Sequence, residues 1–122
     1  MKKILIVDDR EEIRELVEIT LGPRDYHILK AESGEKALQI ARTEIPDLIL
    51  TDIEMPGGMD GLEVTRILRR LPETKNCPII ILTGSGVAGY GKTEGLKAGA
   101  TDYFAKPFSP LALIKKVEEL IK

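Results

Sequence analysis

Cysteine, tryptophan and clustered positive charge are scarce or missing in this sequence of 122 residues. Its one cysteine, Cys77, has no partner for an internal disulfide, which favours a reducing compartment, and we expect a cytoplasmic protein. The 18 Lys and Arg residues are offset by 20 Asp and Glu residues and form no basic stripe. Because a phosphate backbone is bound by clustered basic side chains, we expect no direct contact with nucleic acid.

Long hydrophobic segments are missing as well. The apolar run at residues 4–7 ends at Asp8, which makes it too short for the core of a signal peptide. No segment approaches the roughly 20 apolar residues that span a bilayer as a helix, so we expect no membrane segment. The length fits a single domain, and we expect this domain to cover residues 1–122.

Short apolar runs alternate along the chain with stretches whose apolar residues recur at helical spacing. Several runs are almost unbroken Ile, Leu and Val, which is typical of strands covered on both faces. Strands are predicted at residues 4–7, 27–31, 48–51, 79–82 and 103–105. Helices are predicted around residues 13–21, 37–45, 64–71 and 113–121, with Ser33 and Ser109 as caps.

The segment after the fourth predicted strand is rich in glycine, which disfavours a long helix. We expect a mobile loop there and only a short helix near residues 93–98. The glycines of this segment are at positions 84, 86, 89, 91, 95 and 99.

The alternation predicts an α/β fold, a doubly wound sheet of five parallel strands with helices on both faces. Ligands of such sheets bind at the carboxyl ends of the strands. Polar residues follow four of the predicted strands, and they are Asp8 and Asp9, Asp52, Thr83 and Lys106. In the strand order 2-1-3-4-5 the first and third strands are neighbours, so the three carboxylates would meet at one edge.

Three clustered carboxylates repel one another and require a positive partner. Lys106 offers one, and Mg²⁺, which prefers carboxylate, water and phosphate oxygens, would offer more. This combination suits phosphoryl transfer, in which Asp52 would accept the group and Thr83 would donate a hydrogen bond to one of its oxygens. Taken singly, Asp9 is explained as a helix cap and Lys106 as a turn residue before a proline. Their joint placement at successive strand ends favours a common site.

The whole chain resembles the receiver domains of two-component response regulators, which have a flavodoxin-like fold. The motifs that carry the resemblance are Ile4-Leu5-Ile6-Val7-Asp8-Asp9, Asp52-Ile53-Glu54-Met55-Pro56, Met59-Asp60-Gly61, Ile81-Leu82-Thr83, Gly99-Ala100, Tyr103 and Lys106-Pro107-Phe108.

The resemblance implies that Asp52 is the phosphorylated nucleophile. It also implies a Mg²⁺ site made by Asp52, by Asp9, by Asp8 directly or through water, and by the backbone carbonyl of Glu54. The acidic pocket predicted from the strand ends would thus be a phosphoryl acceptor that works with a metal.

Three further roles follow from the resemblance. Lys106 would contact the phosphoryl group, and its peptide bond to Pro107 would be cis. Thr83 and Tyr103 would form the switch pair. On phosphorylation, Thr83 would move toward the phosphate and Tyr103 would turn inward. This movement would remodel the face of the fourth helix, the fifth strand and the fifth helix, where partners bind.

The implied phosphoryl donor is a sensor histidine kinase or a phosphotransfer protein, and the implied recipient of the signal is a downstream effector protein or domain. The chain would be a signalling switch rather than an enzyme, since it would catalyse only its own phosphorylation and dephosphorylation. The sequence leaves open whether it forms a homodimer.

The sequence departs from the family pattern in two places. The loop of residues 55–61 and the interval from Thr83 to Lys106 are each one residue longer than usual. Glu54 and Ser85 occupy positions that tune the lifetime of the phosphate in this family. Arg69, by contrast, is interpreted as part of a solvated helix face.

Three alternative interpretations remain. Residues 86–93 match the phosphate-binding pattern G-x-x-x-x-G-K-[ST] after a strand, but glycines interrupt the helix that should follow. A phosphatase of the haloacid dehalogenase type would need a second Asp where Glu54 stands. A flavodoxin-like carrier would need a first loop that attracts phosphate, and the acidic loop that begins at Asp8 repels it.

Overall fold

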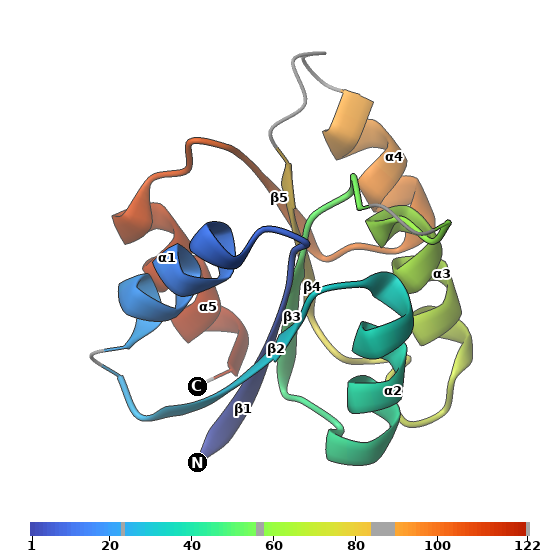
Figure 1. Cartoon of the computed structure of the whole chain (residues 1–122), viewed down its shortest axis with the longest axis horizontal. Coiled ribbons are helices and arrows are strands. Elements are labelled where there is room, and N and C mark those ends of the chain that lie inside the picture. The colour runs from blue at the N-terminus through green and yellow to red at the C-terminus, as the bar shows by residue number, and fades with distance from the viewer. Residues whose placement is uncertain (23, 56–57, 84–89, 122) are drawn as a thin grey trace.

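The computed structural model describes residues 1–22, 24–55, 58–83 and 90–121 of the chain. They form one parallel sheet of five strands in the order β2-β1-β3-β4-β5 (Figure 1). The strands are β1 (Lys2–Val7), β2 (Tyr26–Ala31), β3 (Leu48–Thr51), β4 (Ile79–Thr83) and β5 (Asp102–Ala105). The helices are α1 (Glu11–Leu21), α2 (Gly34–Glu44), α3 (Gly61–Arg70), α4 (Tyr90–Ala98) and α5 (Pro110–Ile121). The predicted fold class and strand order are confirmed.

Helices cover both faces of the sheet, α1 and α5 on one side and α2, α3 and α4 on the other (Figure 1). On the first face, Leu50 of β3 packs with Val17 of α1 and Leu113 of α5. On the second face, Ile49 of the same strand packs with Leu68 of α3. Successive residues of β3 therefore enter opposite cores, which is why this strand is an unbroken apolar run. Among the described residues, no helix has the length and hydropathy to span a bilayer.

Local chemistry sets several helix boundaries as predicted. The hydroxyls of Ser33 and Ser109 each accept a hydrogen bond of 3.2 Å from a backbone N–H in the first turn of α2 and α5. Helix α1 begins at Glu11 and has no side-chain cap, so Asp9 does not have the capping role that was its simplest structural explanation.

Three local predictions differ from the structure. Leu16 belongs to the apolar spacing of α1, yet it is 48% exposed and lines a pocket with Ile13 and Phe108. Ile45 ends α2 in the left-handed conformation with φ of 47° and is 51% exposed. Helix α4 begins at Tyr90, three residues before the predicted start.

Residues 84–89 lie outside the described part of the chain. They include Ser85, the first half of the phosphate-binding pattern at residues 86–93, and much of the loop predicted to be mobile.

Arg69 is not part of a solvated face, which corrects the prediction. Its guanidinium group donates hydrogen bonds to the carbonyl oxygens of Cys77 at 2.6 Å and Gly99 at 2.8 Å, and to the hydroxyl of Thr101 at 3.3 Å. Burial lowers the pKa of this guanidinium and raises the pKa of the Cys77 thiol to about 11. Arg69 therefore ties the end of α3 to the turn between α4 and β5.

The strand register places the predicted polar residues at one edge. The N–H of Asp8 donates to the carbonyl of Ala31 at 3.1 Å, and the N–H of Asp52 donates to the carbonyl of Val7 at 3.0 Å. Each bond extends the sheet one residue beyond its last regular pair, so Asp8 and Asp52 are held by backbone contacts on adjacent strands.

Gly61 lets the start of α3 pass directly against the backbone of Asp52. Its N–H donates to the carbonyl of Ile53 at 2.8 Å, and a Cβ at this position would collide with the carbonyl oxygen of Asp52. A side chain here would therefore displace the backbone that carries Asp52.

We predict that Gly61→Ala lowers the free energy of unfolding by about 2 kcal/mol, because the added methyl overpacks this contact. Gly95→Ala is the matched control, since its Cβ would meet Ile81 at an ordinary distance of 3.5 Å within α4. Removing a helical glycine should raise stability by about 0.5–1 kcal/mol. Urea denaturation measures both, and equal effects of the two substitutions would contradict the close contact at Gly61.

Candidate functional site

Three carboxylates converge where β1 and β3 end. Asp8, Asp9 and Asp52 each offer a carboxylate oxygen, and these oxygens lie within 4.8 Å of one another. Asp8 is 2% exposed and Asp52 is 6% exposed, whereas Asp9 faces solvent. Two of the three acids are thus removed from water. Like charges repel one another more strongly in the protein interior than in water.

The ammonium group of Lys106 supplies the positive charge that this cluster requires. Its Nζ lies 2.8 Å from Oδ2 of Asp8 and 3.4 Å from Oδ2 of Asp52, and its side chain is only 10% exposed. The N–H of Lys106 donates to the carbonyl of Thr83 at 2.7 Å, and its peptide bond to Pro107 is cis, as the resemblance implied. One buried cation is therefore shared by two buried carboxylates.

Asp52 is the acid with the most perturbed surroundings. Burial raises its pKa, the charge of Lys106 acts in the opposite direction, and the charge of Asp8 raises it again. Its Oδ1 also accepts the N–H of Ile53 at 2.8 Å, which favours the ionised form and fixes the carboxylate. The result is an oriented carboxylate whose Oδ2 faces the lysine.

The remaining predicted residues surround this centre. Thr83 is 1% exposed at the end of β4, between the strand of Asp52 and the strand that leads to Lys106. Tyr103 of β5 is half-buried and packs against the cluster of Ile53, Leu62, Ile81, Ala98 and Ala100. The side chain of Glu54 is exposed and is not part of the carboxylate cluster.

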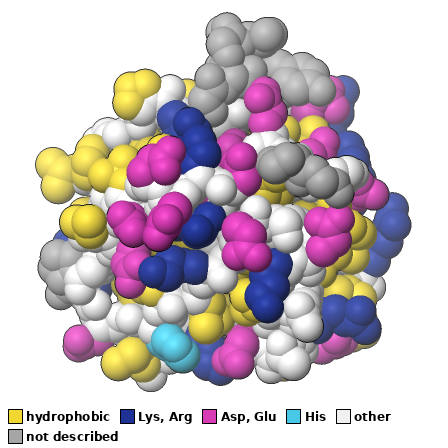
Figure 2. All heavy atoms as spheres, in the orientation of Figure 1, with side chains coloured by type: hydrophobic (Ala, Val, Ile, Leu, Met, Phe, Trp, Pro, Cys, Tyr) yellow, Lys and Arg dark blue, Asp and Glu magenta, His cyan; other side chains and the backbone are white. Residues whose placement is uncertain are grey.

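Two arginines of the site were not identified from the sequence. The N–H of Arg10 donates to Oδ1 of Asp8 at 3.0 Å, and its Nε lies 3.7 Å from the same oxygen. A guanidinium nitrogen of Arg14 donates to the carbonyl of Asp8 at 2.7 Å. The sequence does contain a signal, because Arg10 directly follows the acid pair and Arg14 lies about one helical turn beyond Arg10. Basic and acidic side chains are also interspersed on the face that Figure 2 shows.

The donor atoms fit a hard divalent cation. The cluster offers only carboxylate oxygens, and its acids outnumber the single lysine that pairs with Asp8 and Asp52. Mg²⁺ is bound in proteins through one or two carboxylates with water and phosphate oxygens, so both the ligand type and the excess charge suit it.

The chain matches the family model of the response regulator receiver domain over residues 4–118. The phosphate regulon transcriptional regulatory protein PhoB of Pseudomonas aeruginosa is 40% identical over 121 residues, which are 99% of this chain and 52% of that protein. The transcriptional regulatory protein ResD of Bacillus subtilis is 42% identical over 98% of this chain and 48% of its own length. The chain spans about half the length of these curated relatives.

Solved structures agree with this match. The chemotaxis protein CheY4 of Vibrio cholerae has a TM-score of 0.88 and 36% identity, with 98% of both chains covered. The receiver domain of the Francisella response regulator 1452 has a TM-score of 0.87 and 34% identity, with 99% of this chain and 97% of that chain covered. With its sheet order, its acidic strand ends and the match over residues 4–118, the chain belongs to the response regulator receiver domain family of two-component signalling.

Proposed function

We propose that this receiver domain, extending over residues 1–122, accepts a phosphoryl group on Asp52 and carries the signal by a change of conformation. The observation that supports the proposal is the position of the Lys106 ammonium group, 2.8 Å from Asp8 and 3.4 Å from Asp52 beside an oxygen-only cluster. An ion pair with a purely structural role would need only one carboxylate to balance the charge of one lysine. The excess of acids suits a site that takes up further positive charge.

The chemistry assigns Asp52 the role of nucleophile. A carboxylate oxygen of Asp52 attacks the phosphorus of the donor, a new P–O bond forms, and the bond to the leaving group breaks with its electron pair. The Lys106 ammonium group stabilises negative charge on the transferring group, and Thr83 donates its hydroxyl hydrogen to a phosphoryl oxygen. The product is an acyl phosphate, which water then hydrolyses at the same site.

Asp8, Asp9, Asp52 and the backbone carbonyl of Glu54 are the residues that would hold Mg²⁺. When bound, Mg²⁺ supplies positive charge against the phosphoryl oxygens. The buried position of Asp8 and Asp52 makes this charge more effective than it would be in water.

The switch pair would be Thr83 and Tyr103. Thr83 moves toward the phosphoryl oxygens, and Tyr103 turns further into the cluster against which it already packs. The face formed by α4, β5 and α5 would then change shape and bind a downstream effector protein or domain. A cytoplasmic histidine kinase or phosphotransfer protein is the proposed donor, and a homodimer is a further candidate assembly.

Acetyl phosphate with Mg²⁺ should add one phosphoryl group to the chain, as mass spectrometry of the intact protein would show. Asp52→Asn removes the nucleophile and should abolish the addition, and so should a chelator. Asp25→Asn, at an exposed carboxylate before β2, is the matched control and should be phosphorylated normally. A wild-type protein that remains unmodified by acetyl phosphate and Mg²⁺ would contradict the proposal.

Mg²⁺ should stabilise the fold without any phosphodonor, since it binds the folded cluster and not the unfolded chain. At a concentration tenfold above its Kd the free energy of unfolding should rise by about 1.4 kcal/mol. Asp9→Asn should lose most of this gain and Asp25→Asn should retain it. Denaturation curves with and without Mg²⁺ measure the gain in the free energy of unfolding. Equal gains for Asp9→Asn and Asp25→Asn would exclude Asp9 as a ligand.

Asp52→Asn should make the metal-free protein more stable at neutral pH. The pKa of Asp52 is raised in the folded state, so its ionisation costs more there than in the unfolded chain. This cost is absent below the unfolded pKa, grows as pH rises above about 4, and is complete above the raised pKa. The difference between variant and wild type in denaturation experiments should therefore vanish at low pH. A variant that is less stable at pH 7 would contradict the charge assignment.

A further inference from the structure

Arg10 lies directly beside the acid cluster but is only loosely engaged by it. Its backbone N–H donates to Oδ1 of Asp8 at 3.0 Å, which holds the residue in place. Its guanidinium Nε is 3.7 Å from that same oxygen, too far for a hydrogen bond, and the side chain is 50% exposed. Within the described residues this ion pair is the one charged contact of the guanidinium. Because the guanidinium is beyond hydrogen-bond distance of this carboxylate and half-exposed, it can turn toward another anion.

Lys106 differs from Arg10 in this respect. Its side chain is 10% exposed, and its Nζ is engaged by Asp8 and Asp52 at 2.8 and 3.4 Å. Lys106 is thus already engaged by two carboxylates, whereas Arg10 is half-exposed beside the same cluster.

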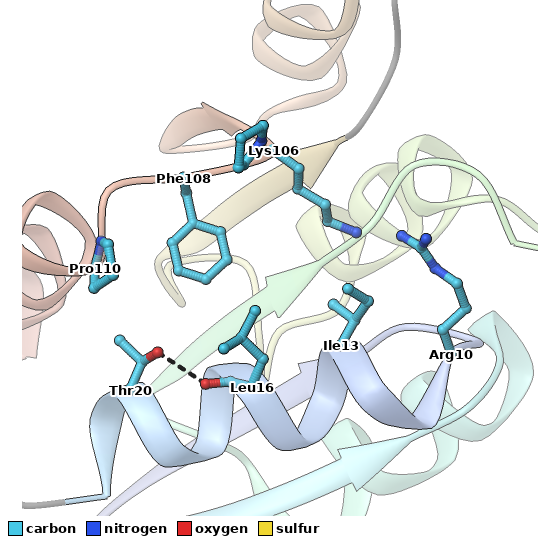
Figure 3. A pocket seen from close by; sticks show the side chains of 8 residues that line it. Arg10, Ile13, Leu16, Thr20, Lys106, Phe108 and Pro110 are labelled. Carbon is cyan, nitrogen blue, oxygen red and sulfur yellow. Dashed lines mark hydrogen bonds between the residues drawn. The ribbon is translucent and has the colours of Figure 1, made fainter.

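Both cations line the same pocket, which has a volume of about 350 Å³. Figure 3 shows Lys106 and Arg10 extending from opposite walls, with their nitrogen atoms directed toward one another. The rest of the lining is mainly apolar and includes Ile13, Leu16 and Phe108. The lining contains none of the three carboxylates, so the pocket adjoins the cluster through Lys106 and Arg10, which both contact Asp8.

The charge of the cluster makes a second free cation useful. Mg²⁺ and Lys106 together carry as many positive charges as the three carboxylates carry negative ones. A phosphodonor brings a further negative group to a centre that is then only neutral. A guanidinium group presents parallel N–H donors that match the oxygens of a phosphate.

We propose that Arg10 is a phosphodonor-binding residue, whose guanidinium leaves Asp8 and donates to oxygens of the incoming phosphoryl group opposite Lys106. The inference rests on the proposed phosphorylation of Asp52. The transfer step is unchanged: the Asp52 oxygen forms a bond to phosphorus while the bond to the leaving group breaks with its electron pair. Arg10 exchanges no proton in this step and acts through its charge and hydrogen bonds.

The test measures the second-order rate constant of phosphorylation by acetyl phosphate at saturating Mg²⁺. Arg10→Gln should lower it about tenfold, the loss of one charge-assisted hydrogen bond. Arg10→Lys keeps the positive charge but lacks the paired N–H donors of a guanidinium. Its rate constant should lie between those of Arg10→Gln and the wild type. Arg66→Gln, at an exposed arginine of α3, makes the same change in net charge and should have little effect.

A second measurement, the Kd for Mg²⁺ by calorimetry without donor, separates donor binding from a role in holding Asp8. Arg10→Gln should bind Mg²⁺ no more weakly than wild type, because a competing cation has been removed from Asp8. A rate equal to that of Arg66→Gln would overturn the proposal. So would a lower rate that is matched by an equal loss of Mg²⁺ affinity. If the wild type itself is not phosphorylated, the phosphorylation of Asp52 fails, and this inference fails with it.

Discussion

The ammonium group of Lys106 between the carboxylates of Asp8 and Asp52 is the contact on which the geometry of the site depends. Two buried acids on neighbouring strands would repel one another without it, and burial strengthens that repulsion. Lys106 comes from the end of β5, so its side chain crosses the row of strand ends that includes Thr83. The strand order and the reach of this side chain together set the charge arrangement at the edge of the sheet.

The parts of the structure that depend on local chemistry could be predicted from the sequence. Unbroken apolar runs indicated the strands, and Ser33 and Ser109 cap their helices through contacts within one turn. The convergence of Asp8, Asp9 and Asp52 could also be predicted, because parallel strands end at a common edge. The family match agrees with this interpretation and not with a phosphatase or a flavin carrier.

The parts of the structure that depend on contacts between distant residues could not be predicted from the sequence. Arg69 resembles any exposed arginine in a helix, and its partners Cys77 and Gly99 are up to 30 residues away. Leu16 fits the apolar spacing of α1, but periodicity does not show where the edge of the covered face lies. A basic residue after two acids is typical of ordinary charge balance, so the sequence alone does not show that Arg10 lines a pocket with Lys106.

The hydrogen bonds that Arg69 donates affect how this domain tolerates mutation. Most of its acceptors are backbone carbonyls, including those of Lys75 and Cys77, and a carbonyl is present whatever the side chain. Substitutions at Lys75 and Cys77 therefore leave these acceptors in place, whereas Gly99 does not tolerate a side chain, because its φ is 111° and a Cβ there would lie 2.8 Å from Cγ of Arg69. Replacing Arg69 removes all of these hydrogen bonds at once. The connection between α3 and the turn before β5 is thus encoded mainly at Arg69 and Gly99, while positions such as Lys75 contribute only their backbone.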